Sequence, residues 1–299
     1  MTKVVVTDTN LTNIANAIRT KGGTSELIKP SEMATAITNL PSGGILQTKS
    51  VNINDNGTQS IIADTGYEGL EQVNVTTNIQ GEISGITSIT IENNVTSVKD
   101  LSLPYVTNAS YLFQNHTSLI TTSNLTFSSE LSDIRYMYQG CSNLKQASKM
   151  LYDNLTNIST LFSGCVNLEE VPEFGNTSEV TNMANLFRDC AKIKSVPYFN
   201  TPIVQYMQNF IRGCTLLTDF PYLNIPSVTN LSSFVMDTPN LTDTSLNNIL
   251  KMCISARNMS GSNKTLSYMG FTETNYPATR IQSLPDYENF INAGWTIGY

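Results

Sequence analysis

The sequence predicts an α/β repeat protein, a solenoid preceded by a small helical segment and a small β module. A pattern of 24 or 25 residues recurs six times in the middle of the chain. Within each copy, the apolar residues change from helical spacing to a short extended piece. The residues on either side follow other patterns, which predict further helices and strands before and after the repeats.

The six copies align on a nine-residue motif, as in TLFSGCVNL and NLFRDCAKI, whose third letter we take as position 0. Apolar residues recur at positions −7, −4, −1, 0 and +3, which share one face of a helix. Each repeat is therefore expected to begin with a short helix, for example residues 180–190, and to continue as an extended piece over positions +6 to +12. One repeat cannot fold alone, and stacking would supply the missing core. The residues at position 0 are Phe113, Tyr138, Phe162, Phe187, Ile211 and Val235, and the first four are expected to form one internal column of rings.

The flanking patterns predict separate elements. Residues 10–40 carry two amphipathic stripes, which predict two helices with few apolar side chains. Residues 45–79 alternate, with turn signals at Asn56-Gly57 and Gly66, which predicts strands. The expected regions are a helical segment (1–43), a small β module (44–80), the solenoid with its N-terminal cap (81–247, six repeats from about 104) and a C-terminal capping region (248–299).

The C-terminal capping region is expected to alternate helix and strand. A helix is expected from about Thr244, a strand at 265–271, and a helix ended by Gly294 before a final strand. Such terminal elements are needed to cover the last apolar face of a stack.

Composition narrows the classes of function. The 299 residues carry a net charge of −7, which argues against binding nucleic acid, because phosphate contacts need a basic patch. A third of the residues are Asn, Thr or Ser, so the expected surface is polar without being strongly charged. No run of 18 apolar residues occurs, so no membrane span is expected. The apolar run near the start, which ends before Asp8, is too short for a signal peptide.

The cysteines follow the repeat. Cys141, Cys165, Cys190 and Cys214 all stand at position +3. Since no CxxC pair or HExxH motif occurs, we interpret the column as small buried core residues. All five cysteines, Cys253 included, are expected to be reduced and to bind no metal. His116 holds the same position in the first repeat and is the only histidine in the chain, so a Ser-His-Asp or Cys-His site could use only this residue.

The repeat lettering resembles the BspA-type leucine-rich repeat. VTNMANLFRDCAKIKSVP, at 180–197, is nearly a full match to its pattern, and the resemblance covers roughly residues 100–247. It implies a leucine-rich-repeat solenoid, curved and right-handed, with one face lined by strands.

Both ends of the chain carry a second resemblance. LTNIANAIRTKGGTSELIKPSEMATAI, GYEGLEQVNVTTNI and LPDYENFINAGWTIGY are similar to segments of tail-associated virion proteins from phages and prophages of Gram-positive bacteria. This resemblance implies a virion component, assembled in the cytoplasm of the bacterial host, with an N-terminal attachment segment and an outward solenoid. Residues 1–43 are then expected to become ordered against other virion proteins or sister copies, and a homo-oligomer in the particle is expected.

The extended pieces give the candidate binding face. Tyr198 and Tyr222 share position +11 outside the apolar columns, so we expect them to be exposed and to stack one repeat apart. Glu173, Lys194 and Asp219 lie nearby and could supply oriented hydrogen bonds. A tyrosine ring can lie on a sugar or pack into a protein interface while its hydroxyl stays wet, so a host cell-wall glycan, a host surface protein or a neighbouring virion protein are the expected partners.

Three functions follow from these patterns. We favour a structural protein of the phage tail tip, baseplate or fibre that displays the solenoid for host recognition or protein–protein interaction. The alternative is a BspA-like surface adhesin of a bacterium, which would need an export signal. A virion-associated glycan hydrolase is less favoured, because Glu169 and Glu170 are adjacent, whereas glycosidases oppose two carboxylates across the substrate. No enzymatic activity, catalytic residue, metal or cofactor is therefore expected.

Overall fold

The computed structural model describes residues 46–53, 59–61, 69–77, 89–91, 95–103 and 106–299. All of them lie in one of the two units into which the chain divides, Leu46–Tyr299. The helices expected in the segment 1–43, and the turns expected at Asn56-Gly57 and Gly66, lie outside the described residues.

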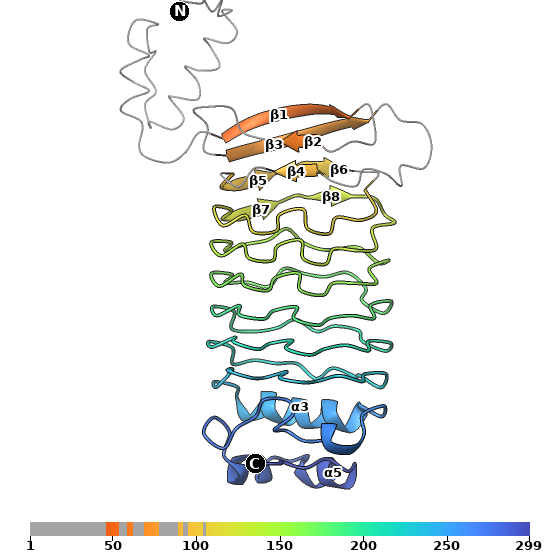
Figure 1. Ribbon diagram of the computed structural model, residues 1–299, viewed down its shortest axis with the longest axis vertical. Helices are drawn as coiled ribbons and strands as arrows, with labels where there is room; N and C mark the ends of the chain where they lie inside the picture. Colours follow the sequence, from red (N-terminus) through yellow and green to blue (C-terminus); the bar gives the residue numbers. More distant parts are fainter. Residues whose placement is uncertain (1–45, 54–58, 62–68, 78–88, 92–94, 104–105) are drawn as a thin grey trace, which may run out of the picture. The chain divides into compact units, whose positions relative to one another are not determined.

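The first described strands form parallel pairs (Figure 1). In the larger sheet, β3 lies between β1 on one side and both β5 and β6 on the other, and the last two pair in turn with β7 and β8. The sheet crosses residue 80, so strands of the expected β module and of the expected solenoid share it; the region boundaries stay predictions. Its strands are β1 (Leu46–Ile53), β3 (Gly69–Thr77), β5 (Ser97–Lys99), β6 (Leu101–Leu103), β7 (Thr121–Ser123) and β8 (Thr126–Phe127), and β2 (Gln59–Ile61) pairs separately with β4 (Ile89–Ile91).

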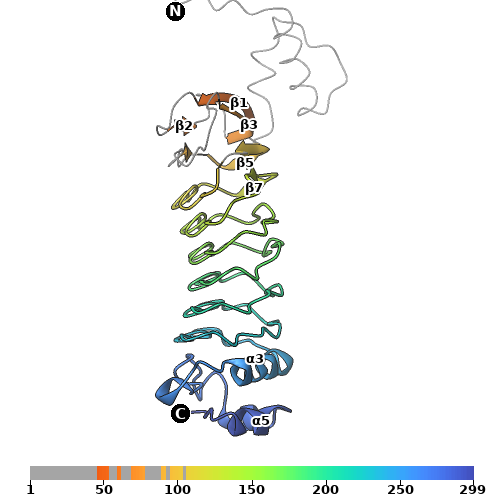
Figure 2. The same ribbon diagram turned by 90° about the vertical axis from the view of Figure 1, so that its right-hand side faces the viewer.

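From residue 106 on, consecutive repeats are joined by isolated parallel bridges. The spacing of 24 or 25 residues seen in the sequence is the spacing between bridged residues, and neighbouring repeats lie side by side in both views (Figures 1 and 2). Other bridges join the same position in neighbouring repeats, as Ser195 and Asp219 do at +8 and Met150 and Phe174 do at +12. The longest series runs through position −5 and consists of Asn108, Asp133, Asn157, Asn182, Tyr206 and Asn230.

The expected α/β leucine-rich-repeat solenoid is wrong. The structure is mixed, with short parallel strands and few helices, and residues 106–242 contain no α-helix. The segment 180–190, expected to be helical, forms consecutive turns. Asn185 and Asp189, at positions −2 and +2, have φ of 57° and 60°, and such left-handed residues interrupt a right-handed helix.

Hydrogen bonding gives the second reason for the missing helices. The N–H groups of Asn185, Phe187 and Asp189 donate to carbonyls of the next repeat, at 2.9, 3.0 and 2.7 Å. In an α-helix the same groups would donate to the residue four positions earlier. The apolar spacing that predicted a helix is thus produced by a series of turns whose alternate N–H groups bind the neighbouring repeat.

The apolar columns predicted from the repeat fill the core, although the backbone around them is not helical. The rings at position 0 stack at centroid distances of 5.2, 5.4 and 6.0 Å, with planes within 11° of parallel. This confirms the expected ring column. From the fifth repeat the aromatic residue moves to position −1, where Phe210 and Phe234 stack at 5.4 Å. The four stacked rings of the first part are Phe113, Tyr138, Phe162 and Phe187.

Uncharged polar side chains bind the repeats to one another. At position −6, the hydroxyl of Thr156 donates to the carbonyl of Ser132 at 3.2 Å, and later repeats repeat this bond. At position +5, the amide of Asn143 donates to the carbonyl of Thr117 at 2.8 Å, again with later equivalents. At position −5, the side chain of Asn157 acts within its own repeat, where it accepts a hydrogen bond from the backbone N–H of Ser159. Much of the Asn and Thr content therefore has a structural role between repeats.

The chain after the repeats provides the described α-helices. The helix expected near Thr244 is confirmed as α3 (Asp243–Ser255), whose N-terminus is capped by the Thr242 hydroxyl. The helix expected before Gly294 is α5 (Tyr287–Asn292), preceded by η2 (Gly261–Asn263) and α4 (Ala278–Gln282). The expected strands there are wrong, since only one bridge, Thr265 to Thr296, forms between them.

The C-terminal segment nevertheless continues the backbone bonding of the repeats. The N–H groups of Ser233 and Val235, in the last repeat, donate at 2.9 Å to the carbonyls of Tyr268 and Met269. Residues 266–270 thus take the place that the next repeat would occupy.

Candidate functional site

The cysteine column belongs to the core. Cys141, Cys165, Cys190 and Cys214 are fully buried and free, and each thiol donates to the position 0 carbonyl of the preceding repeat at 2.9 to 3.1 Å. Burial raises the pKa of the Cys141 thiol to about 12 and raises the pKa of the other three as well. Because the reactive form of cysteine is the thiolate, these thiols are poorly suited to catalysis.

His116 is also a core residue. Its side chain is 5% exposed, its ring lies edge-on to Phe113 at 6.0 Å, and its Nδ1 lies 3.2 Å from the carbonyl oxygen of Gln114. Over the described ranges, no group of three or more His, Cys, Asp or Glu side chains could hold a metal ion, and no helix is long and apolar enough to cross a membrane.

The outward-facing candidate is a row of side chains at position +11, which we call the outer row. All of its members are exposed. Within the row, the ammonium of Lys149 lies 2.8 Å from the Glu173 carboxylate, and the amide of Asn124 donates at 2.6 Å to Asp100, which lies outside the row. The outer row consists of Asn124, Lys149, Glu173, Tyr198 and Tyr222.

The structure gathers some of the predicted site residues and separates others. Tyr198 is 65% exposed and Tyr222 is 39% exposed, and both lie in the outer row with Glu173. Lys194 and Asp219 lie at positions +7 and +8 of neighbouring repeats, where the carbonyl of Lys194 accepts the N–H of Asp219 at 3.1 Å.

The expected stacking of the two tyrosines is not seen. In the part of the chain that the structure describes, their rings make no ring-to-ring contact, unlike the buried rings of the core. The Asp219 carboxylate, expected to offer hydrogen bonds beside the tyrosines, accepts a hydrogen bond of 2.6 Å from the hydroxyl of the adjacent Thr218. Tyr198 and Tyr222 are thus two separate exposed rings on one row.

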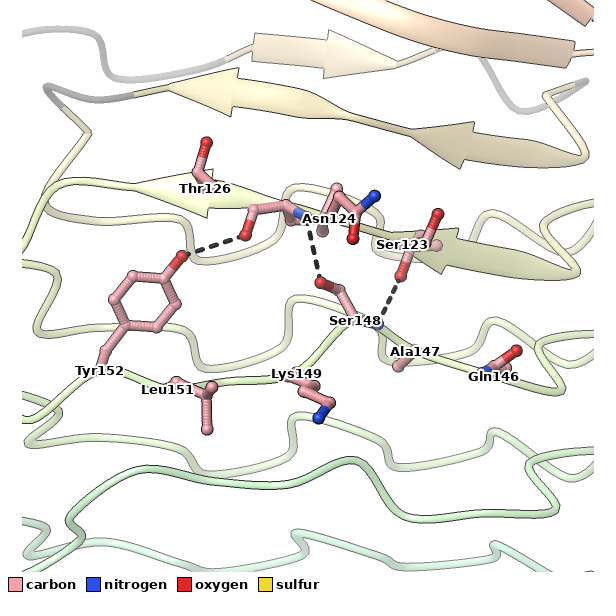
Figure 3. Close-up of a pocket in the computed structure, with 11 residues that line it drawn as sticks. Ser123, Asn124, Thr126, Gln146, Ala147, Ser148, Lys149, Leu151 and Tyr152 are labelled. Carbon is pink, nitrogen blue, oxygen red and sulfur yellow. Dashed lines mark hydrogen bonds between the residues drawn. The ribbon is translucent and has the colours of Figure 1, made fainter.

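A pocket that the sequence did not indicate lies beside the start of the outer row. It has a volume of about 410 Å³ and is lined by one segment from each of two neighbouring repeats, 122–126 and 146–152 (Figure 3). Asn124 and Lys149 of the outer row lie at its wall. Leu151, 58% exposed, and the half-buried Tyr152 are on the same segment as Lys149.

Hydroxyl groups join the two walls of the pocket (Figure 3). The Ser148 hydroxyl accepts the N–H of Leu125 at 3.1 Å, and the Ser148 N–H donates to the hydroxyl of Thr122 at 3.0 Å. The Tyr152 hydroxyl accepts the N–H of Phe127 at 3.0 Å and donates to the carbonyl of Leu125 at 3.2 Å. A hydroxyl placed between two backbones holds them farther apart than a direct N–H to carbonyl bond, which explains the pocket.

A signal for this pocket does exist in the sequence. Position +10 is serine in the first two repeats, Ser123 and Ser148, and proline in the next three, Pro172, Pro197 and Pro221. Proline cannot donate the backbone hydrogen bond that Ser148 makes. The change of residue type therefore marks where the connection between repeats changes.

A stacked pair of one exposed and one half-buried tyrosine was also missed. Tyr111 and Tyr136 stack at 4.8 Å with planes 6° apart, and Tyr111 is 47% exposed. Both stand at position −2 with φ of 66° and 59°, where later repeats have Thr, Asn or Ser. The helical interpretation of this segment gave no reason to expect that these two rings stack near the surface.

Comparison with known proteins gives one finding on the repeats. The family model described as "Mycoplasma protein of unknown function, DUF285" matches residues 132–249, which is less than half of the chain. This domain is found in BspA-like repeat proteins, which agrees with the coarser part of the resemblance seen in the sequence. No curated protein matches the chain.

Proposed function

We propose that this chain is a structural component of a phage virion, at the tail tip, baseplate or fibre, and that the outer row contacts a partner. The observation that carries the contact surface is the exposure of Tyr198 and Tyr222 on neighbouring repeats, outside every core column. Exposed tyrosines are frequent anchors of binding surfaces. The virion assignment is supported by the sequence resemblance at both ends of the chain.

On this proposal the segment 1–43 attaches the chain to other virion proteins or to sister copies, and the repeats face outward. The partner of the outer row is a host cell-wall glycan, a host surface protein or a neighbouring virion protein. The protein acts by binding, without an enzymatic step or a cofactor, and it is located in the assembled particle.

A test begins with immunogold labelling of intact particles, which should find the protein at the tail. The double variant Tyr198→Ala, Tyr222→Ala should then keep the melting temperature of the parent, because both side chains are exposed. Normal assembly with poor adsorption to cells would identify the host surface as the partner, and failed assembly would identify a virion protein. Normal assembly with normal adsorption would refute the role of the outer row.

The second candidate is a BspA-like surface adhesin of a bacterium. It is favoured by the match of residues 132–249 to a domain found in BspA-like repeat proteins. Labelling that finds the protein on the bacterial surface and on no particle would favour the adhesin.

A further inference from the structure

We infer that the pocket between segments 122–126 and 146–152 binds one residue of a neutral sugar. The first argument is the chemistry of the lining. Exposed amide and hydroxyl groups come from Asn124 and Thr126 on one wall and from Gln146 on the other. Amides and hydroxyls both donate and accept hydrogen bonds, as the hydroxyls of a sugar require.

Charge is the second argument. Lys149 is the one charged residue among those that line the pocket, and its ammonium lies 2.8 Å from the Glu173 carboxylate. Its charge is therefore already compensated, and the Asn124 amide is bonded to the carboxylate of Asp100 at 2.6 Å. A phosphate or carboxylate ligand would find no unpaired cation and would lie near two carboxylates, so an uncharged ligand is favoured.

The third argument comes from the apolar part of the pocket. Leu151 lines it and is 58% exposed, although no core role requires a leucine there. A sugar ring combines hydroxyls at its edge with a face of C–H groups, and that face can cover such a side chain. The volume of about 410 Å³ falls within the range of small-molecule sites, roughly 300–1,000 Å³.

A peptide strand fits the pocket less well. Strand addition needs backbone N–H and carbonyl groups that are open to a new partner. Here the N–H and carbonyl of Leu125, the N–H of Phe127 and the N–H of Ser148 are bound by hydroxyls of the opposite wall. What remains for a ligand is a set of side chains around a limited space, which suits a single sugar unit.

The inference deepens the proposed function, because a sugar on this side of the molecule would belong to the host surface. Its test, however, needs only the purified full-length chain. Saturation-transfer NMR with glucose, galactose and N-acetylglucosamine should show transfer to at least one of them. A dissociation constant of roughly millimolar is expected for so open a site.

The variants are chosen at exposed positions so that folding is preserved. Gln146→Leu removes the amide at similar size, and Leu151→Ser removes the apolar surface. Each should weaken the binding of the sugar by about tenfold, the effect of losing one good contact. Gln205→Leu and Leu216→Ser are matched controls, since both residues are exposed on later repeats outside the pocket, and they should bind as the parent does.

The inference is overturned if none of the three sugars shows transfer, or if binding survives both pocket variants. Binding of glucose 6-phosphate more tightly than glucose would overturn the argument from charge, and binding of a short Ser/Asn peptide alone would point to a peptide site. Sugar binding by a chain that immunogold labelling does not find on particles would leave the inference standing and refute the proposed function. A labelled chain that binds no sugar would do the opposite.

Discussion

Phe162→Ala is the substitution that examines the ring column most directly. Phe162 is fully buried and lies between two parallel rings, Tyr138 at 5.4 Å and Phe187 at 6.0 Å. Truncating a buried phenylalanine costs about 3–5 kcal/mol, because the apolar transfer free energy is lost and a cavity remains. Since both faces of the ring are in contact, we expect a cost in the free energy of unfolding near the upper end of that range.

The assay is urea unfolding followed by circular dichroism, with Phe174→Ala as the matched control. Phe174 is half-buried and has one ring neighbour, Phe199, at 5.1 Å in an edge-on geometry. Its truncation should cost about half as much as that of Phe162, because less surface returns to water. A cost below about 1 kcal/mol for Phe162→Ala would mean that the ring is not packed in a column.

A double-mutant cycle separates ring stacking from burial. Phe162→Leu combined with Phe187→Leu should show a coupling of about 0.5–1.5 kcal/mol, the usual value for an aromatic pair. Tyr138→Leu with Phe187→Leu is the control, since Phe162 lies between these two rings and their coupling should be within about 0.5 kcal/mol of zero. Equal couplings in the two cycles would refute the stacked order.

Two further predictions concern backbone strain and pH. Gly270→Ala should lower the free energy of unfolding by several kcal/mol, because φ of Gly270 is 89° and the new Cβ would lie 2.8 Å from the Cα and N of Met236. Gly261→Ala is the control: its φ is 61° but no atom lies close to the new Cβ, so it should cost about 1–2 kcal/mol, and equal melting temperatures for the two variants would contradict the clash. Because burial raises the pKa of Cys141 from 9.0 to about 12, the unfolded thiol ionises first and stability should fall between those pH values. Cys141→Ser should reduce that slope in unfolding measurements made across the range, and an unchanged slope would contradict the assignment.

The sequence was sufficient to predict which residues form the core, but it was not sufficient to predict the conformation of the backbone that carries them. Phe113, Tyr138, Phe162 and Phe187 were placed in one column because their spacing matches the repeat, and this does not depend on the local conformation. The prediction of a helix was wrong because a series of turns buries the same positions, −7, −4, −1, 0 and +3, that one face of a helix would bury. At position +2 every repeat has Asn, Gly or Asp, the residue types that most readily adopt a left-handed conformation. At position −2, residues such as Tyr111 and Thr160, with φ of 66° and 61°, carry no such signal, so contacts with neighbouring repeats decide their conformation.

The candidate site divides in a similar way. Tyr198 and Tyr222 could be placed outside the core columns from their position alone, and their exposure confirms it. The pocket could not be found in this manner, because it depends on how the hydroxyls of Ser148 and Tyr152 bridge to one neighbouring segment. The same residue types elsewhere in the repeats make other bonds, so the three-dimensional arrangement was needed.

Positions that bond neighbouring repeats differ in residue type from the positions of the outer row. Where a side chain bonds the preceding repeat, its chemistry recurs: threonine or serine at five of the six −6 positions, asparagine at three of the six +5 positions, and cysteine at four of the six +3 positions. At position +11 the five residues are an amide, an ammonium, a carboxylate and two phenols, and all five are exposed. Stacking therefore repeats the same bonds in the first set, whereas the bonds made in the outer row, Asn124 with Asp100 and Lys149 with Glu173, differ from one repeat to the next. A row whose chemistry is not set by the fold is the part of this chain best suited to recognise a partner, and its two tyrosines and the adjoining pocket are the places where that recognition should be sought first.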